Sequence, residues 1–132
     1  MRILLISFLL MCGLFANDYK SFAKKMGYEL EYDIALQKAQ KENKDILFVM
    51  VANFCPWCTK FEKLVLSKKD IAKTINDKYI PLIMNREEKR FPPKYDSELI
   101  PTIYFVDHKS EVIKEKVVGY NNRQDFINII NR

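Results

Sequence analysis

Two cysteines separated by two residues are the part of this sequence best suited to chemistry. Cys55 and Cys58 enclose Pro56 and Trp57 and follow the apolar run 46–52. This order predicts a buried strand that turns sharply into a helix, with Pro56 at the first helical position, where its missing N–H costs nothing. Cys55 would lie at the helix N-terminus, where unpaired N–H groups and the helix dipole favour a thiolate. We therefore expect Cys55 to be a nucleophile near neutral pH, and Cys58, one turn further on, to close a disulfide with it.

A structural disulfide and a zinc site are the alternative interpretations of this cysteine pair. A loop this short restrains the unfolded chain little, so the pair would stabilise the fold only weakly. A zinc site needs about four ligands, whereas the sequence after residue 16 offers Cys55, Cys58 and His108. His108 lies in the turn pattern 107–110, which indicates a solvated turn residue. We therefore expect redox use of the cysteines, with no metal and no cofactor.

The first sixteen residues have the pattern of a secretory signal peptide. Arg2 supplies a positive start, residues 3–15 are apolar, and Ala16 offers a small residue at a cleavage point. The apolar run is shorter than the ~20 residues that span a bilayer. We predict a signal peptide over 1–16 and a periplasmic location. Cys12 leaves a lipoprotein as an alternative, and an uncleaved membrane anchor is another.

Length and charge describe the remaining chain. With 132 residues and 48% hydrophobic content, the sequence predicts a single domain with one core over 17–132. The net charge is +5, but basic and acidic residues are interleaved. This favours a mixed, solvated surface over a nucleic-acid interface, so no nucleic-acid partner is expected.

The elements that must position the cysteines follow from the apolar pattern. The predicted strands cover 28–32, 46–51, 79–84, 101–106 and 111–118. The predicted helices cover 18–26, 33–43 from a cap at Asp33, 59–66, a segment opening at Ser67, and a last segment capped by Asn121 or Asn122. Pro81 indicates that its strand starts late or is irregular. The charged stretch 85–99 is interpreted as a solvated loop, or alternatively as a partner-recognition loop.

The order of these elements predicts an α/β fold. Strands and helices alternate in the first half of the chain, which implies a parallel crossover. The second half ends in an antiparallel hairpin and a helix. The prediction is therefore a mixed central sheet with helices on both faces.

With these elements in place, the chain resembles the thioredoxin family over roughly residues 28–132. Three motifs carry the resemblance: Cys55-Pro56-Trp57-Cys58 after a buried strand, Ile100-Pro101-Thr102 before the next strand, and Val118-Gly119-Tyr120 before the last helix. The lead-in over 35–44 is similar to the secreted bacterial thioredoxin-like branch. The resemblance implies a thioredoxin-like fold with a nucleophilic Cys55, a resolving Cys58 and a cis peptide before Pro101.

The same resemblance implies where a substrate would bind. The loop with the cis peptide is expected to pack against the disulfide and to hold the substrate backbone. Substrate contacts are assigned to Pro56, Trp57, Ile100 and Pro101.

The sequence also departs from thioredoxin itself. Phe54 replaces the tryptophan before the first cysteine, and Pro-Trp between the cysteines is closer to the Pro-Tyr of glutaredoxins. Val49 stands at the strand position where thioredoxin buries an aspartate. Glu62, four residues after Cys58, is a possible substitute for that acid, although a solvated helix glutamate is the favoured interpretation.

These expectations give a functional hypothesis: a thiol–disulfide oxidoreductase that reduces disulfides outside the cytoplasm. Ile100 before the proline resembles reducing thioredoxins and favours this direction. The expected partners are client proteins with disulfides and a membrane or soluble electron donor, and the expected state is a monomer. A protein-disulfide oxidase or isomerase is one alternative. A thioredoxin-fold module that binds a metal or a partner without turnover is another.

Overall fold

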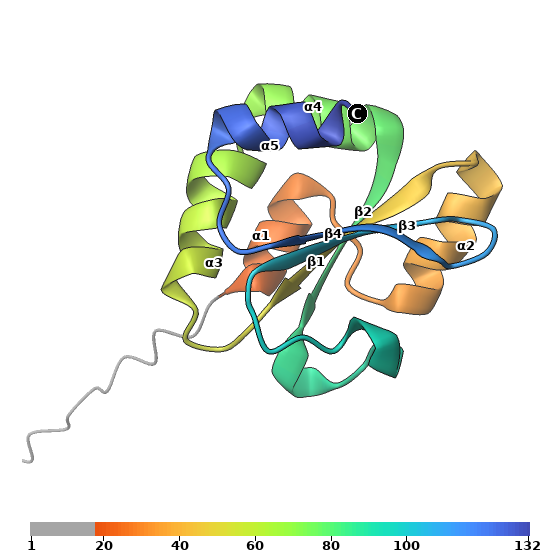
Figure 1. The fold of residues 1–132 in the computed structure, drawn as a ribbon, viewed down its shortest axis with the longest axis horizontal. Coiled ribbons are helices and arrows are strands. Elements are labelled where there is room, and N and C mark those ends of the chain that lie inside the picture. Colours follow the sequence, from red (N-terminus) through yellow and green to blue (C-terminus); the bar gives the residue numbers. More distant parts are fainter. Residues whose placement is uncertain (1–17) are drawn as a thin grey trace, which may run out of the picture.

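The computed structural model describes residues 18–132, so the predicted signal peptide at 1–16 lies outside the described part. A four-stranded sheet in the order β2-β1-β3-β4 forms its centre (Figure 1). The strands are β1 (Asp45–Val51), β2 (Tyr79–Asn85), β3 (Thr102–Val106) and β4 (Ile113–Val118). β1 pairs parallel with β2 and antiparallel with β3, and β3 pairs antiparallel with β4. The predicted mixed sheet is confirmed.

Helices surround this sheet. They are α1 (Tyr19–Met26), α2 (Tyr32–Glu42), α3 (Pro56–Phe61), α4 (Lys69–Lys78) and α5 (Arg123–Ile130), together with a π-helix, η1 (Glu62–Leu66), and two 3-10 turns, η2 (Arg86–Glu88) and η3 (Pro93–Tyr95). η1 follows α3 without a break, so the two form one continuous helical segment. Among residues 18–132, no helix combines the length and the apolar character needed to cross a bilayer.

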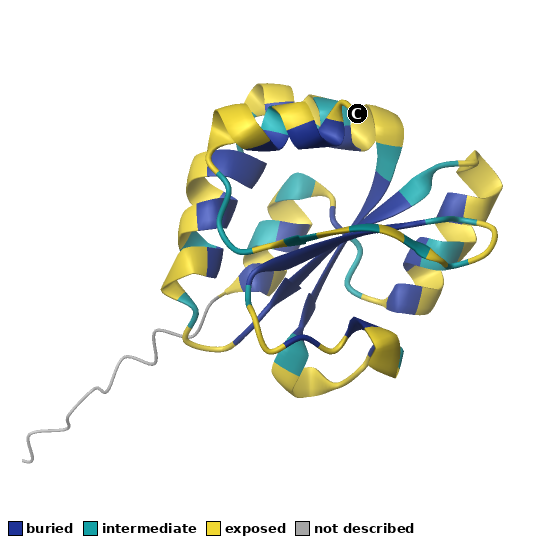
Figure 2. Ribbon diagram, in the orientation of Figure 1, coloured by how far each residue is buried: buried dark blue, intermediate teal, exposed yellow. Residues whose placement is uncertain are grey.

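Two apolar cores lie on the two faces of the sheet, and β1 contributes to both. Leu47, Val49 and Val51 point into the core under α1, α3, α4 and α5. The alternate residues Ile46, Phe48 and Met50 point into the core under α2. β1 therefore carries no polar face, because helices cover both of its sides. Figure 2 shows the buried central strands against the exposed outer faces of the helices.

The core under α2 is built on aromatic side chains. The ring of Phe48 contacts those of Tyr32, Phe91, Tyr95 and Tyr104, with centroids 5.2 to 6.4 Å apart. Two of these rings come from the charged stretch 85–99. The interpretation of that stretch as a solvated loop is therefore wrong in part, since its aromatic residues are buried while its charges face outward.

The predicted edge strand over 28–32 is largely absent. Only Glu29 pairs with β2: its N–H donates to the Pro81 carbonyl, and the Ile83 N–H donates to its carbonyl. The chain then turns, and α2 begins at Tyr32 rather than after a cap at Asp33. One backbone pair is enough here because α2 must start immediately to cover the second core.

Pro81 lies within a regular β2, opposite Leu47 of β1, so the expected irregularity is wrong. β2 is an edge strand. The carbonyl of Pro81 points outward to Glu29, and its nitrogen faces the same outer side, where the sheet needs no donor.

Ser67 also differs from its predicted role. It ends η1, where its hydroxyl donates to the Lys63 carbonyl at 2.7 Å, and α4 begins at Lys69. At the last helix, the Asn122 side chain accepts from the Asp125 N–H at 2.9 Å, which confirms the cap predicted there.

Candidate active site

The cysteine pair lies directly after β1. The chain turns at Asn53 and Phe54, where Phe54 has a left-handed φ of 51°, and Cys55 caps the N-terminus of α3. Cys55 and Cys58 form a disulfide, with their Cα atoms 5.2 Å apart. Pro56 is the first helical residue, as predicted.

The two sulfurs have different environments. Cys58 is fully buried, whereas Cys55 is only partly buried. The Cys58 N–H donates to the Cys55 Sγ at 3.2 Å. This N–H and the dipole of the helical segment both favour a negative charge on Cys55 once the disulfide is reduced. Cys55 is therefore the sulfur that another molecule can reach.

The loop before β3 lies beside this pair. The Ile100–Pro101 peptide is cis, as predicted. Met50 pairs with Thr102, so Pro101 comes next to the end of β1, from which the chain continues to Cys55. Ile100 and Cys55 pack against the same apolar core. The structure therefore brings these two predicted site segments together.

Two further contacts tie the site loops to one another. The Gly119 N–H donates to the Pro101 carbonyl at 2.8 Å, which fixes the loop after β4 against the cis-proline loop. From that loop, Tyr120 places its ring 5.5 Å from the ring of Trp57. The Lys60 Nζ lies 4.8 Å from the Trp57 ring centroid and 5.2 Å from that of Tyr120.

A polar network at the end of β2, which the sequence did not reveal, supports the turn before the cysteines. The Asn85 side chain is buried and donates to the Asn53 Oδ1 at 2.7 Å. The Asn53 N–H donates to the Glu87 carboxylate at 3.1 Å, and the Glu87 N–H donates to the Asn85 Oδ1 at 2.9 Å. The turn that leads into Cys55 is thus held from β2.

The same segment also holds the cis-proline loop. Arg86 donates to the carbonyl of Glu98 at 2.9 Å and to that of Ser97 at 3.3 Å. The Thr102 hydroxyl donates to the Leu99 carbonyl. The one signal in the sequence was a polar pair, Asn85-Arg86, at the end of an apolar strand, where side chains from neighbouring strands meet.

Several large apolar side chains in the segments that adjoin the disulfide are exposed. They are Phe54 and Trp57 of the cysteine turn and Leu99 of the cis-proline loop. Exposed apolar side chains gathered beside a reactive group indicate a surface that binds another molecule.

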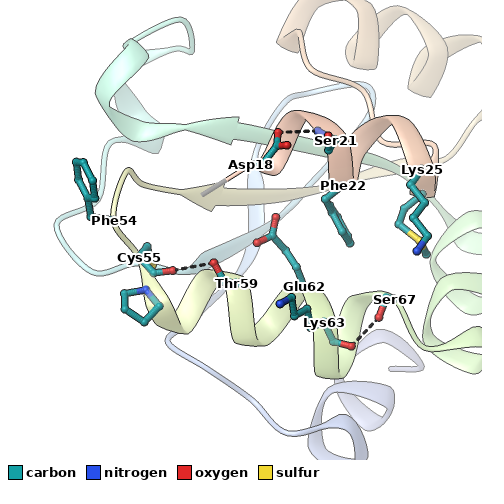
Figure 3. A pocket seen from close by; sticks show the side chains of 12 residues that line it. Asp18, Ser21, Phe22, Lys25, Phe54, Cys55, Thr59, Glu62, Lys63 and Ser67 are labelled. Carbon is teal, nitrogen blue, oxygen red and sulfur yellow. Dashed lines mark hydrogen bonds between the residues drawn. The ribbon is translucent and has the colours of Figure 1, made fainter. Parts of the chain in front are cut away.

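Glu62 is buried, with 5% of its surface exposed, so the favoured interpretation of a solvated helix glutamate is wrong. Its carboxylate points from η1 toward α1 (Figure 3). Burial, and then the negative charge of Glu62, raise the pKa of Tyr28. The reason for the error is α1, which covers this face of the helical segment. Val49 lies in the same core as Cys58 and supplies no acid.

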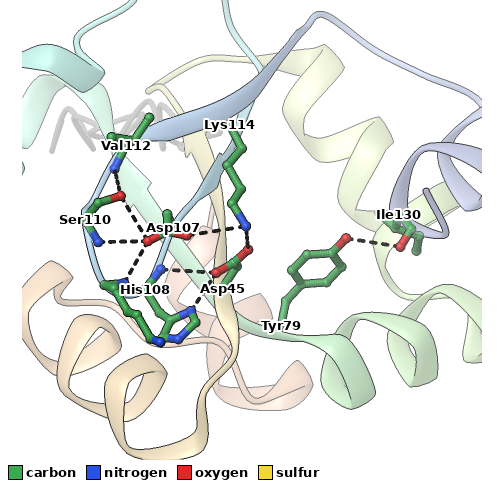
Figure 4. Close-up of polar contacts among 9 residues, drawn as sticks. Asp45, Tyr79, Asp107, His108, Ser110, Val112, Lys114 and Ile130 are labelled. Atoms are coloured by element: carbon green, nitrogen blue, oxygen red, sulfur yellow. Dashed lines mark hydrogen bonds and ion pairs between the residues drawn. The ribbon is translucent and has the colours of Figure 1, made fainter.

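At the opposite end of β1 lies a second group of titratable residues. Asp45, Asp107 and His108 place ligand-type atoms within 4.8 Å of one another, which makes them the one candidate metal cluster among residues 18–132. However, the Lys114 Nζ lies 2.6 Å from the Asp45 carboxylate and 3.4 Å from that of Asp107 (Figure 4). A lysine ammonium already supplies the positive charge, so these residues do not fit a metal ion.

His108 is in the predicted turn, but its side chain is not solvated. It is 17% exposed, and its Nδ1 lies 2.8 Å from the Asp45 Oδ1. Burial alone would raise the pKa of Asp45, but the hydrogen bonds from His108 and Lys114 outweigh it and hold that pKa below its usual value. His108 is thus engaged at the end of β1 away from the cysteines, and the three ligands considered for zinc do not come together.

Comparison with known proteins supports this description of the fold. Residues 32–132 match the family described as the thioredoxin-like domain. A thioredoxin from Thermus thermophilus superposes with a TM-score of 0.68 and 18% identity, over 79% of this chain and 84% of that one. The DsbH oxidoreductase superposes with a TM-score of 0.66 and 12% sequence identity, over 78% of this chain and 83% of that one. The oxidised C-terminal domain of DsbD from Neisseria meningitidis superposes with a TM-score of 0.60 and 16% sequence identity, over 78% of this chain and 97% of that domain.

Relatives detected by sequence are longer than this chain. An uncharacterized protein of Borreliella burgdorferi is 27% identical over 119 residues, which make up 90% of this chain and 52% of that protein. Spermatogenesis-associated protein 20 of Mus musculus is 33% identical over 55 residues, or 42% of this chain and 7% of that protein. The chain thus spans about half of the first relative and a small part of the second.

The family match and the geometry agree. Residues 32–132 contain the sheet, the cis-proline loop and the Cys55–Cys58 disulfide. A thioredoxin-like fold with this cysteine pair supports thiol–disulfide oxidoreductase chemistry. This chain belongs to the thioredoxin-like domain family.

Proposed function

We propose that this protein reduces disulfides of client proteins outside the cytoplasm, with Cys55 as the attacking and Cys58 as the resolving residue. The observation that carries the proposal is the asymmetry of the pair. Cys55 is accessible at a helix N-terminus beside exposed apolar side chains, and Cys58 is buried behind it. This arrangement suits attack by one sulfur on a large molecule and release by the other.

The reaction proceeds in two exchanges. The Cys55 thiolate attacks one client sulfur, and the other client sulfur leaves as a thiolate. Cys58, after losing its proton, then attacks the Cys55 sulfur, and the first client sulfur leaves in turn. The client disulfide gains two electrons and two protons, and the Cys55–Cys58 disulfide forms. A dithiol donor, membrane-bound or soluble, must reduce that disulfide before the next turnover.

We assign Glu62 as the group that accepts the proton of the Cys58 thiol. It lies four residues after Cys58, and this spacing places both side chains on the same face of a helical segment. Like Cys58, it is buried, and burial disfavours the charged form of a carboxyl group. A buried carboxyl group at this position can take the Cys58 proton during the second exchange, where Val49 supplies no acid.

The exposed apolar side chains are assigned to client docking. Phe54 and Trp57 adjoin the disulfide in the cysteine turn, and Leu99 lies in the cis-proline loop. Leu99 and Pro101 are both fixed through their carbonyls. The backbone of Ile100 between them is the expected pairing site for an extended client segment.

Location outside the cytoplasm is proposed from the predicted signal peptide at 1–16. Expression of the full chain with detection in a periplasmic extract tests this point. Retention of residues 1–16 in a cytosolic protein would contradict it.

The direction of electron flow is proposed from the surroundings of Cys55. One N–H and a helix end act on its sulfur, without a buried acid at Val49. Such modest stabilisation of the thiolate favours a potential in the reducing half of the range between about −270 and about −120 mV. Equilibration with glutathione buffers measures this potential, and reduction of insulin in the presence of dithiothreitol measures turnover.

Two other outcomes are possible in these assays. A potential near the oxidising end would assign the protein to oxidation or isomerisation of client disulfides. A disulphide isomerase from Xylella fastidiosa shares the fold at a TM-score of 0.61 and 17% identity. No acceleration of insulin reduction would assign it to a binding module instead.

A further inference from the structure

A groove lies on the α1 side of Cys55 (Figure 3). It has a volume of about 850 Å³ and runs between α1 and the helical segment of α3 and η1, from Cys55 at one end to Ser67 at the other. Of the described residues, none from the 99–101 loop lines it. The groove is therefore separate from the docking surface assigned above and shares only the cysteine turn with it.

The walls near Cys55 are apolar. Phe22 and Met26 of α1 face the helical segment, and Phe54 and Pro56 form the end beside the sulfur. The Phe54 side chain is 68% exposed, so its ring is accessible to another molecule. An apolar hollow that ends at a nucleophile fits a part of the molecule that the nucleophile attacks.

The length of the groove fits a piece of polypeptide. α3 has six residues and η1 has five, which at a rise of about 1.5 Å each gives roughly 16 Å. An extended chain covers this distance in about five residues. The outer half is formed by a π-helix, a rare conformation that is frequent at functional sites.

The outer part of the groove is positively charged. Lys25 of α1 and Lys63 of η1 line it, and both are exposed. Within residues 18–132, neither lysine takes part in an ion pair. Asp18, the exposed acid on the rim, is engaged as the cap of α1, where it accepts from the Ser21 N–H at 3.1 Å. Glu62 also lines the groove but is buried, and the Asp18 carboxylate keeps its charge, so the exposed charges of the lining are two lysines against one aspartate.

We propose that this α1–α3 groove binds the extended client segment adjoining the client cysteine that Cys55 attacks. Bulky apolar side chains of that segment lie on Phe22, Met26 and Phe54. An acidic side chain about four or five residues from the client cysteine lies between Lys25 and Lys63. This inference rests on the proposed function and adds a substrate preference to it: clients with an apolar segment that ends in an acid.

Synthetic peptide disulfides test the charge preference. Two probes carry a cysteine, three leucines and then either glutamate or lysine, and each is made with the segment before or after the cysteine. For the wild type, we expect kcat/KM to be about tenfold higher for the better-placed glutamate probe than for its lysine partner, the scale of two exposed charge contacts. Equal values for both probes in both orders would overturn the proposal.

A matched pair of variants locates the effect. K25E/K63E should lose or reverse the preference for glutamate. K24E/K69E makes the same change in net charge at exposed lysines of α1 and α4 that do not line the groove, and it should retain the preference. An equal loss in both variants would show a general charge effect and contradict the groove. Replacing the three leucines by glycines should raise KM for the wild type about tenfold or more, and an unchanged KM would also contradict it.

A small substrate and a binding measurement separate this inference from the proposed function. Hydroxyethyl disulfide has no segment to occupy the groove, so K25E/K63E and K24E/K69E, which make the same change in net charge, should change its rate of reduction by the same factor. If the wild type reduces neither this compound nor the peptides, the proposed function fails. Calorimetry of the Cys55→Ser variant with the glutamate peptide, its cysteine replaced by serine, then decides the groove alone: binding that K25E/K63E removes supports it, and no binding refutes it.

Discussion

Each end of β1 carries a polar cluster, and these two clusters are built in different ways. Asp45 begins the strand in a network of charges, with Lys114 and His108 within 2.8 Å of its carboxylate. Beyond Val51, at the other end, the cysteine turn is held by the side-chain amide of Asn85 and by the Glu87 carboxylate, which accepts from the Asn53 N–H. Charged side chains at the first end have partners, whereas apolar side chains at the second end are exposed.

This difference shows which end is suited to act on another molecule. By residue type, Asp45, Asp107 and His108 are the more familiar catalytic or metal-binding set. Their charges are satisfied within the protein, so little free energy is gained by adding a ligand. At the cysteine end, Phe54 and Trp57 remain exposed and can be buried only by a partner. The composition of a cluster therefore predicts function less well than what its side chains leave unsatisfied.

The largest expected effect is at the accessible sulfur. Cys55→Ser should abolish insulin reduction, because no other sulfur at the surface of residues 18–132 can start the exchange. Cys58→Ala should instead accumulate mixed disulfides with clients, since the resolving step is lost. Non-reducing gels and mass spectrometry of the trapped species measure this. If Cys55→Ala traps clients and Cys58→Ala does not, the two roles are reversed.

The next effect concerns Glu62. Glu62→Gln keeps the size of the side chain but cannot accept the Cys58 proton, so release of the client from the mixed disulfide should slow by roughly 100-fold at pH 7, the lower range for general bases. Raising the pH should relieve the loss, because Cys58 then ionises without help. Stopped-flow release against pH measures it, with Glu98→Gln, an exposed glutamate, as control. A slowing that is the same at every pH would indicate a structural role only.

A smaller effect is expected at the network that holds the cysteine turn. Asn85→Ala removes the donor to Asn53 and the acceptor for the Glu87 N–H, and should lower the free energy of unfolding by about 1–3 kcal/mol. It should also raise KM for insulin, since the turn and the cis-proline loop are both fixed from this segment. Asn76→Ala, an exposed asparagine on α4, is the control for urea unfolding. An unchanged KM would show that the network stabilises the fold without affecting client binding.

The sequence predicted the roles of the cysteine pair, but it did not predict the burial of Glu62 or the network around Asn85, for physical reasons. The cysteine motif and its spacing were sufficient to predict the disulfide, because neighbouring residues encode its local geometry. The cis peptide before Pro101 was predicted from the resemblance to the thioredoxin family. Asn85 and Glu62 act through contacts with Asn53 and with α1, which lie more than thirty residues away in the chain.

The fold was predicted to a similar extent. Each strand from 46 onward was predicted near its observed position. Continuous apolar runs indicated β1, β2 and β3, and the turn at 107–110 indicated β4 as the second strand of a hairpin. The segment 28–32 was predicted incorrectly as a strand. Its alternating tyrosines suggested one buried face, whereas Tyr28 packs into the core under α1 and Tyr32 into the core under α2. The burial of Phe91 and Tyr95 was hidden by the charged residues around them.

The smallest expected effect is at the amino end of β1. Lys114→Met removes the ammonium beside Asp45 and should cost about 0.5–1 kcal/mol at pH 7, more than Lys73→Met, whose partner Asp77 is 58% exposed. The pKa of Asp45 is lowered in the folded protein, so its contribution is complete above the unfolded value of 3.8 and is lost as the pH falls through the folded value. The difference between the two variants should therefore shrink below about pH 4. Thermal unfolding from pH 7 to pH 2 measures it. Reduction of insulin at pH 7 should be unchanged in both variants, and a loss of activity in Lys114→Met would mean that the two ends of β1 are coupled after all.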